Sequence, residues 1–292
     1  MVHLSEPGPD TGVFDTTEVR GWKNVANSTS RMIRLPRGHY KQPPNIAAGF
    51  RALDLEYETP VRANLVVDDI TTKSFRIACE TWSSSTMYSA AATWIEHKRN
   101  ARDCLFGQFD TDDATGPNDS EKGKSKKITF SRPFPGDCKV LCWLNRIDLA
   151  SGGKDWRIRA HARDVSSEGF TAHIDVWGDT EMNGAAMCWI AFPTPKKHVQ
   201  SGSFSTNDLR SWSNPIPNNS AHVQFDKGAF GEGKVPTVLV GLNMLDIAGN
   251  ANLRIKTDVD EISHEGFRWH LDSWADSTLY AAGASWIALD YD

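Results

Sequence analysis

Apolar and polar residues alternate with a period of two along much of the chain. In the stretch LRIKTDV at 253–259, every second residue is apolar or threonine and the others are charged. The stretch GFRWHLD at 266–272 alternates in the same way. This period is typical of antiparallel strands with one buried and one solvated face. No stretch combines a helical apolar stripe with capping residues, and segments rich in turn residues separate the alternating runs. The pattern predicts an all-β protein.

One set of anchor residues recurs three times. Each copy opens with Gly-x-Phe, continues with a Leu/Ile-Asp pair, an arginine and a phenylalanine, and ends with two tryptophans twelve residues apart. The openings are Gly12-Val-Phe14, Gly107-Gln-Phe109 and Gly202-Ser-Phe204, and the acidic pairs are Leu53-Asp54, Ile147-Asp148 and Leu245-Asp246. The later anchors are Arg62, Arg157 and Arg254, then Phe75, Phe170 and Phe267, then Trp82/Trp94, Trp177/Trp189 and Trp274/Trp286. We therefore predict three tandem β-sandwich repeats, at 1–100, 101–198 and 199–292.

Strand register separates the two tryptophans of each pair. When the strand phenylalanine is placed inward, Trp82, Trp177 and Trp274 fall out of register with the core, and so do the three arginines. The second tryptophans lie beside isoleucine in alanine-rich strands and are expected to pack inside. An alternative is that a β-bulge turns the first tryptophan inward to cover the core edge. The agreement of three copies favours an outward binding surface.

Composition narrows the class of partner. The chain has 292 residues and a net charge of −5, which does not favour nucleic acid or an anionic membrane. No signal peptide or membrane-spanning run is present, so we expect a cytoplasmic protein without membrane insertion, or one released by a non-classical route. The five cysteines are an odd number at irregular spacing, and we expect them to be unpaired.

The sequence contains no known catalytic or metal-binding motif. The nine histidines form no metal-binding motif and no close pair in the sequence, and no nucleophile elbow or recurring acid–base pair is found. We therefore expect no enzyme activity, no metal and no cofactor. A hydrolase with scattered catalytic residues is the remaining enzymatic alternative.

An outward tryptophan and arginine are suited to a sugar. The indole face packs against the axial C–H groups of a sugar ring, and the guanidinium donates several hydrogen bonds to hydroxyls. Such sites are shallow and weak, and three of them in one chain would add avidity.

The anchors resemble the H-type lectin domain of snail agglutinins and discoidins. The shared segments are ITFSRPF at 128–134, VQFDKGAF at 223–230 and the weaker MIRLPRGHY at 32–40, together with the Leu-Asp, Arg, Gly-Phe, Trp, Tyr and Trp-Ile positions. The resemblance covers nearly the whole chain. It implies six-stranded antiparallel sandwiches that bind N-acetylgalactosamine or galactose without metal, at the seams of a trimer of domains.

The resemblance also assigns candidate carbohydrate-binding residues. They are the arginines Arg62, Arg157 and Arg254; the tryptophans Trp82, Trp177 and Trp274; Tyr88, Asn183 and Tyr280 six places on; and Asn24, Asp119 and Asn214 at the acidic position. Ser83, Gly178 and Ala275 stand where the snail proteins have a sugar-contacting histidine. Cys79 matches one end of the family disulfide, whose other position holds no cysteine.

The middle repeat departs most from the family pattern, because it lacks the tyrosine in addition to the histidine that all three repeats lack. Three copies in one chain predict an intramolecular pseudo-trimer, with Tyr280 near Trp274. The leading function is a multivalent lectin or agglutinin for glycans ending in galactose or N-acetylgalactosamine. The alternative is a structural or protein-interaction protein on the same scaffold without sugar binding.

Overall fold

The computed structural model describes residues 11–114 and 122–290 and places eighteen strands in them, six from each repeat. The strands of the first repeat are β1 (Thr11–Asp15), β2 (Ser28–Arg34), β3 (Asn45–Leu55), β4 (Val61–Asp68), β5 (Ser74–Glu80) and β6 (Met87–His97). Those of the second are β7 (Leu105–Asp110), β8 (Gly123–Thr129), β9 (Cys138–Leu149), β10 (Trp156–Ser166), β11 (Gly169–Val176) and β12 (Met182–Pro193). Those of the third are β13 (Val199–Ser205), β14 (Ser220–Gln224), β15 (Thr237–Ile247), β16 (Leu253–Asp260), β17 (Gly266–Asp272) and β18 (Leu279–Leu289).

The helical content of the described chain is three short 3₁₀ turns, one after the first strand of each repeat. They span Thr16–Glu18, Thr111–Asp113 and Thr206–Asp208. No helix in residues 11–114 and 122–290 is long and apolar enough to span a membrane. The all-β fold expected from the period-two pattern is therefore confirmed.

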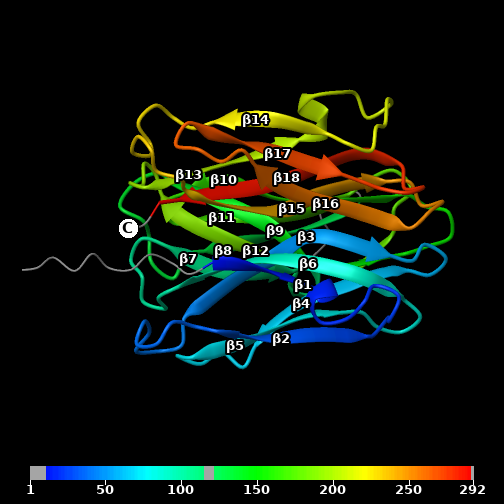
Figure 1. The fold of residues 1–292 in the computed structure, drawn as a ribbon, viewed down its shortest axis with the longest axis horizontal. Helices are drawn as coiled ribbons and strands as arrows, with labels where there is room; N and C mark the ends of the chain where they lie inside the picture. Colours follow the sequence, from blue (N-terminus) through cyan, green and yellow to red (C-terminus); the bar gives the residue numbers. More distant parts are fainter. Residues whose placement is uncertain (1–10, 115–121, 291–292) are drawn as a thin grey trace, which may run out of the picture.

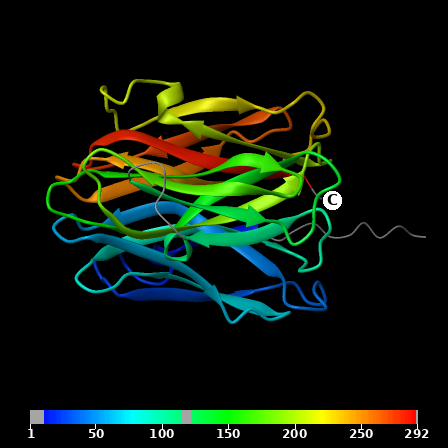
Figure 2. The same cartoon turned by 180° about the vertical axis from the view of Figure 1, so that it is seen from behind.

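The strands form three six-stranded antiparallel sheets, and neighbouring repeats share each sheet. The orders are β1-β6-β3-β16-β17-β14, β13-β18-β15-β10-β11-β8 and β2-β5-β4-β9-β12-β7. Each repeat thus gives three strands to one sheet and three to another, which is a six-stranded sandwich whose halves extend into its neighbours. Figure 1 shows β3 of the blue–cyan first repeat beside β16 of the orange–red third. Figure 2, seen from behind, brings the green strands of the second repeat to the front.

The sharing of sheets closes the three repeats into a ring. The first repeat pairs with the second through β4 and β9, the second with the third through β10 and β15, and the third with the first through β16 and β3. The expected intramolecular pseudo-trimer is therefore the arrangement of the chain. The three β-ladders at these joints are called seams below: seam 1–2, seam 2–3 and seam 3–1.

The second tryptophan of each pair packs in the core, as predicted. Trp94, Trp189 and Trp286 are buried. Each meets the strand phenylalanine of its own repeat edge to face, with ring centroids 5.1, 5.4 and 5.2 Å apart. This is a favourable aromatic geometry. The same contact in all three repeats explains why the phenylalanine and the second tryptophan keep a fixed spacing.

The opening glycine of each repeat makes room for that tryptophan. A Cβ atom would lie 2.6 Å from the Trp94 ring at Gly12, 2.2 Å from Trp189 at Gly107 and 3.0 Å from Trp286 at Gly202. Strands β1, β7 and β13 pair directly with the strands that carry the tryptophans. The Gly-x-Phe signature therefore reflects close approach of a backbone to an indole.

A single tryptophan fills the centre of the pseudo-trimer. Gly49, Trp143 and Gly241 occupy equivalent positions, five residues before the aspartate of β3, β9 and β15. Trp143 is fully buried, and a Cβ at either glycine would lie 2.2 or 2.5 Å from its side chain. Its indole N–H donates to the Ser285 carbonyl at 3.0 Å. The centre is thus asymmetric, which requires the three repeats to differ in sequence.

Candidate functional site

An arginine from one repeat pairs with an aspartate from the next at each seam. Strand pairing places Arg62 opposite Asp148, Arg157 opposite Asp246 and Arg254 opposite Asp54. The Nε-to-carboxylate distances are 3.1, 3.2 and 3.3 Å. All six side chains are largely shielded, with 11–19% of their surface exposed. The recurring Arg and Leu/Ile-Asp anchors are therefore the two halves of one contact between repeats.

A tight turn beside each arginine carries the first tryptophan. The backbone N–H of Ser85, Thr180 or Ser277 donates to the carbonyl of the tryptophan three residues earlier, at 3.2–3.3 Å. Their hydroxyls donate to the carbonyls of Pro60, Asp155 and Asn252, each two residues before the arginine. These bonds fix the turn against the strand that carries the arginine. Arginine and first tryptophan at a seam therefore come from the same repeat.

The residue after each tryptophan has left-handed backbone geometry and is exposed. The φ angles are 58° at Ser83, 64° at Gly178 and 56° at Ala275. A Cβ at Gly178 would lie 2.6 Å from a guanidinium nitrogen of Arg157. Glycine at this place therefore leaves room for the guanidinium of Arg157 beside the turn.

The three first tryptophans are partly exposed at these turns. Trp82, Trp177 and Trp274 are of intermediate burial, in contrast to their buried partners in the core. The Trp177 side chain also hydrogen-bonds Asp246 of the third repeat. The first tryptophans therefore lie in turns just beyond the ends of β5, β11 and β17 and are less buried than the second ones, and Trp177 borders the Arg157–Asp246 pair.

A β-bulge places the next candidate residue at the opposite side of the seam. Tyr88, Asn183 and Tyr280 are each skipped in the pairing of their strand, beside Asp54, Asp148 and Asp246 respectively. Bulges commonly re-aim a side chain at a functional site. The Asn183 amide donates to Asp148 at 3.1 Å.

This placement corrects the expected grouping of Tyr280. The sequence suggested that Tyr280 lies near Trp274 of its own repeat, but strand pairing sets it beside Asp246, which binds Arg157. Tyr88 correspondingly joins the seam of Arg254, and Asn183 that of Arg62. The missing tyrosine of the middle repeat therefore alters seam 1–2 and leaves the site of Trp177 with a tyrosine.

Two exposed tryptophans extend two of the seams, and sequence reasoning missed them. Trp22 is 53% exposed and contacts Tyr88 at 6.2 Å between ring centroids, while Trp212 is 62% exposed and contacts Tyr280 at 6.4 Å. A shared R-x-W-x-N pattern, RGWKN at 20–24 and RSWSN at 210–214, is the signal that would have found them.

The arginine of this pattern ties each loop to the seam. Arg20 donates to the carbonyls of Met87 and Tyr88, and Arg210 does the same to Leu279 and Tyr280. Asn24 and Asn214 are exposed in these loops. Asp119, the third candidate of this group, lies outside the described residues.

The three arginines differ in how many carboxylates surround them. Among the described residues Arg62 binds one carboxylate, that of Asp148, and the Ser85 hydroxyl. Arg254 binds two, Asp54 and Asp276. Arg157 binds three, Asp155, Asp179 and Asp246. The guanidinium has five N–H donors, so Arg62 keeps the most of them for a ligand and Arg157 the fewest.

The buried aspartates of two seams titrate abnormally. Burial raises the pKa of Asp54, against the lowering effect of Arg254. Burial likewise raises the pKa of Asp246, against the lowering effect of Arg157. Shielding from water disfavours the charged carboxylate more than the arginine favours it. The seam aspartates are therefore held in a poorly solvated place.

Comparison with known proteins assigns the three repeats to a family. The family model of the H-type lectin domain matches the chain three times, over residues 37–95, 125–192 and 220–289. No curated protein shows significant sequence similarity to the chain. The chain belongs to the H-type lectin domain family, whose members are carbohydrate-binding and in general non-enzymatic.

The cysteines differ from the family expectation of a disulfide. All five are unpaired, and Cys79 is buried. Burial raises the pKa of the Cys79 thiol far above its usual range. This side chain therefore acts as a small apolar core residue, as the cysteine count predicts.

Proposed function

We propose that the chain binds glycans ending in galactose or N-acetylgalactosamine, with one site at each seam. The observation that carries the proposal recurs at all three seams: an Arg–Asp pair spans two repeats, and the turn hydrogen-bonded two residues before that arginine carries a partly exposed tryptophan. The indole offers an apolar face for the sugar ring, and the remaining guanidinium N–H groups and the aspartate oxygens offer donors and acceptors for its hydroxyls.

The seams are proposed to bind with unequal affinity. Seam 3–1 combines Trp274, an Arg254 with two carboxylate partners, Tyr88 and the exposed Trp22. Seam 1–2 has the least occupied arginine but an asparagine that is already bonded to Asp148. We rank seam 3–1 first for these reasons.

Seam 2–3 is proposed to be the weakest site. Arg157 is bonded to three carboxylates, so its donors are largely used within the protein. The same observation favours the second candidate function, a structural or protein-interaction role, at this seam. A ligand there would have to replace strong charge-assisted hydrogen bonds.

A glycan array tests the proposed function. The folded chain should bind galactose- or N-acetylgalactosamine-terminated glycans, and free N-acetylgalactosamine should compete. The triple variant Trp82→Ala/Trp177→Ala/Trp274→Ala should lose binding, because truncation removes the stacking face at every seam. Met32→Ala removes an exposed apolar side chain on β2 and serves as the control. A folded chain that binds no such glycan would refute the proposal and favour the structural role.

We also propose that one chain supplies the whole ring of sites without a second copy. All three seams are closed within the chain by strand pairing. Sedimentation should give a species near the chain mass of 32.4 kDa. An obligate trimer of chains would contradict this arrangement.

A further inference from the structure

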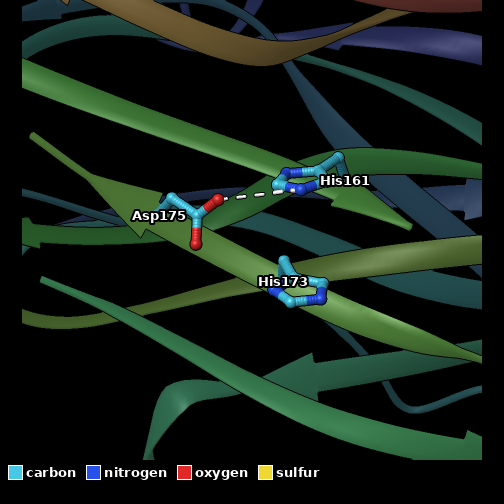
Figure 3. Close-up of side chains that lie close together, drawn as sticks. All are labelled: His161, His173 and Asp175. Atoms are coloured by element: carbon cyan, nitrogen blue, oxygen red, sulfur yellow. Dashed lines mark ion pairs between the residues drawn. The ribbon is translucent and has the colours of Figure 1, made fainter. Parts of the chain in front are cut away.

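Two histidines and an aspartate of the second repeat meet on one face of strands β10 and β11. His161 lies directly opposite His173, and their rings stack with centroids 5.1 Å apart at 9°. Asp175 follows two residues after His173 and directs its carboxylate toward His161, with a 3.6 Å separation from Nε2 (Figure 3). One possible ligand atom from each residue lies within 4.8 Å of the other two. Within the described residues, this is the one group of His, Cys, Asp or Glu side chains with that geometry.

Antiparallel pairing creates this cluster from residues that are distant in sequence. Residues i and i+2 of a strand share a face, and the directly opposite residue of the neighbouring strand joins them. The histidines form no close pair in the sequence, but strand pairing makes two of them neighbours in space.

Polar atoms of the cluster are buried without hydrogen-bond partners. They are His161 Nδ1 and Asp175 Oδ1. Unpaired buried polar atoms are costly and call for an explanation. Gly123, opposite Asp175 on β8, leaves space beside the carboxylate, since a Cβ there would lie 2.5 Å from Oδ1. His161 also lines a cleft together with Cys138, Arg159 and Asn243.

The surroundings keep the imidazoles uncharged. Burial, together with Arg159, His173 and Arg163, lowers the pKa of His161 to about 4 against the opposing effect of Asp175. Burial also lowers the pKa of His173. Neutral imidazole is the form that binds metal ions. Exposed Arg163 donates to His161 Nε2 at 3.0 Å, and a metal at that nitrogen would displace it.

We propose that His161, His173 and Asp175 bind one late first-row divalent cation, with Zn²⁺ as the best match. Two imidazoles and one carboxylate are ligands that Zn²⁺ takes, and water fills the open fourth position. Zinc–ligand bonds of about 2.0 Å set ligand atoms about 3.3 Å apart, so the side chains must close by roughly 1.5 Å. The ion would join β11 to β10, the strand that pairs with β15 at seam 2–3.

The other two repeats lack this combination of two histidines and one aspartate. The first repeat has Val66, Ala78 and Glu80 at the equivalent positions. The third has Asp258, His270 and Asp272, but Asp258 is ion-paired with Arg51 and His270 with Asp260. The chain is therefore expected to bind a single ion.

Cobalt titration of the untagged, metal-free chain tests the site. We expect one equivalent of Co²⁺ to give visible d–d absorption that Zn²⁺ removes by competition, and Zn²⁺ to raise the Tm because it binds only the folded chain. His173→Gln and Asp175→Asn should each weaken binding at least about tenfold. His270→Gln, at the equivalent place in the third repeat, is the matched control and should bind as the unchanged chain does.

Two results would overturn the proposal. One is a folded chain that gives no cobalt spectrum and no Zn²⁺-dependent rise in Tm. The other is binding that survives both His173→Gln and Asp175→Asn, which would place the ion elsewhere. Circular dichroism of each variant confirms that lost binding is not lost folding.

Discussion

At the scale of single residues, one arginine at each seam contacts the neighbouring repeat, and the turn of the partly exposed first tryptophan is bonded just before it in the chain. Arg254, for example, holds Asp54 of the first repeat and Asp276 of its own turn. The same side chain thus contributes to assembly and to the proposed sugar site. The number of guanidinium N–H donors that the carboxylates leave free is expected to decide how tightly each seam binds sugar.

The abnormal aspartates give a pH-dependent prediction. The folded chain holds a proton on Asp54 more tightly than the unfolded chain does, because burial raises its pKa above the ordinary 3.8. Ionisation above pH 3.8 therefore favours the unfolded chain first, and the contribution of Asp54 to stability falls as pH rises. Asp54→Asn should be at least as stable as the unchanged chain at pH 7.

Denaturant titration at several pH values measures this. The free energies of unfolding of the two proteins should converge as pH falls below 3.8, where Asp54 is neutral in both states. If the free energy of unfolding of the unchanged chain instead rises relative to that of Asp54→Asn as pH rises, the ionised pair is the stabilising form and the prediction is wrong.

At the scale of secondary-structure elements, pairing between strands of different repeats creates the seams. Arg254 faces Asp54 through β16 and β3, which are far apart in the sequence. Ion pairs of this kind couple energetically only when the side chains are in contact.

A double-mutant cycle tests the pairing. The stability effects of Arg254→Gln and Asp54→Asn should be non-additive by about 0.5 kcal/mol or more. Arg254→Gln with Asp246→Asn is the matched control and should be additive, since Asp246 belongs to seam 2–3. Equal coupling in both cycles, or none in either, would contradict the strand order.

The opening glycines of the three repeats allow the stability losses of their alanine variants to be ranked. An added methyl group at Gly107 would overlap the Trp189 ring most severely, Gly12 comes next and Gly202 last. Overpacking typically costs about 1–3 kcal/mol. Unfolding free energies should therefore fall most for Gly107→Ala and least for Gly202→Ala. A reversed order would show that the strands shift freely to accommodate the methyl group.

Much of this fold could be predicted from residue spacing, and the limits have physical causes. Period-two alternation separates Trp274 from Trp286 because successive side chains face opposite ways. The position of Tyr280 could not be predicted, because a bulge and pairing with another repeat decide it. Strand register also brings His161 to His173, whereas their separation in sequence conceals the pair. Contacts between distant strands leave little trace in local spacing.

At the scale of the whole molecule, fusion of three repeats allows a centre that three identical chains could not have. Three tryptophans would overlap where Trp143 lies, and three glycines would leave a void. One tryptophan between two glycines fills the space once. The seams can differ from one another for the same reason, because each repeat of a fused chain can change its own turn and loop.

The centre can be tested by truncation. Trp143→Ala should lower the free energy of unfolding by roughly 3–5 kcal/mol, because a large buried ring leaves a cavity that the surrounding sheets cannot fill. Trp212→Ala removes an exposed indole and should change stability little. Denaturant unfolding of both variants provides the comparison, and equal small losses would show that Trp143 does not hold the ring together.

The central claim is that the first tryptophan of each pair contacts sugar and the second does not. The most direct measurement is an NMR titration of the chain with a methyl glycoside of N-acetylgalactosamine, following indole N–H resonances assigned from Trp→Phe variants. We predict that the resonance of Trp274 shifts most, those of Trp82 and Trp177 shift less, and those of Trp94, Trp189 and Trp286 stay in place. Saturating sugar that moves none of the first three, or moves the core indoles equally, would contradict the account.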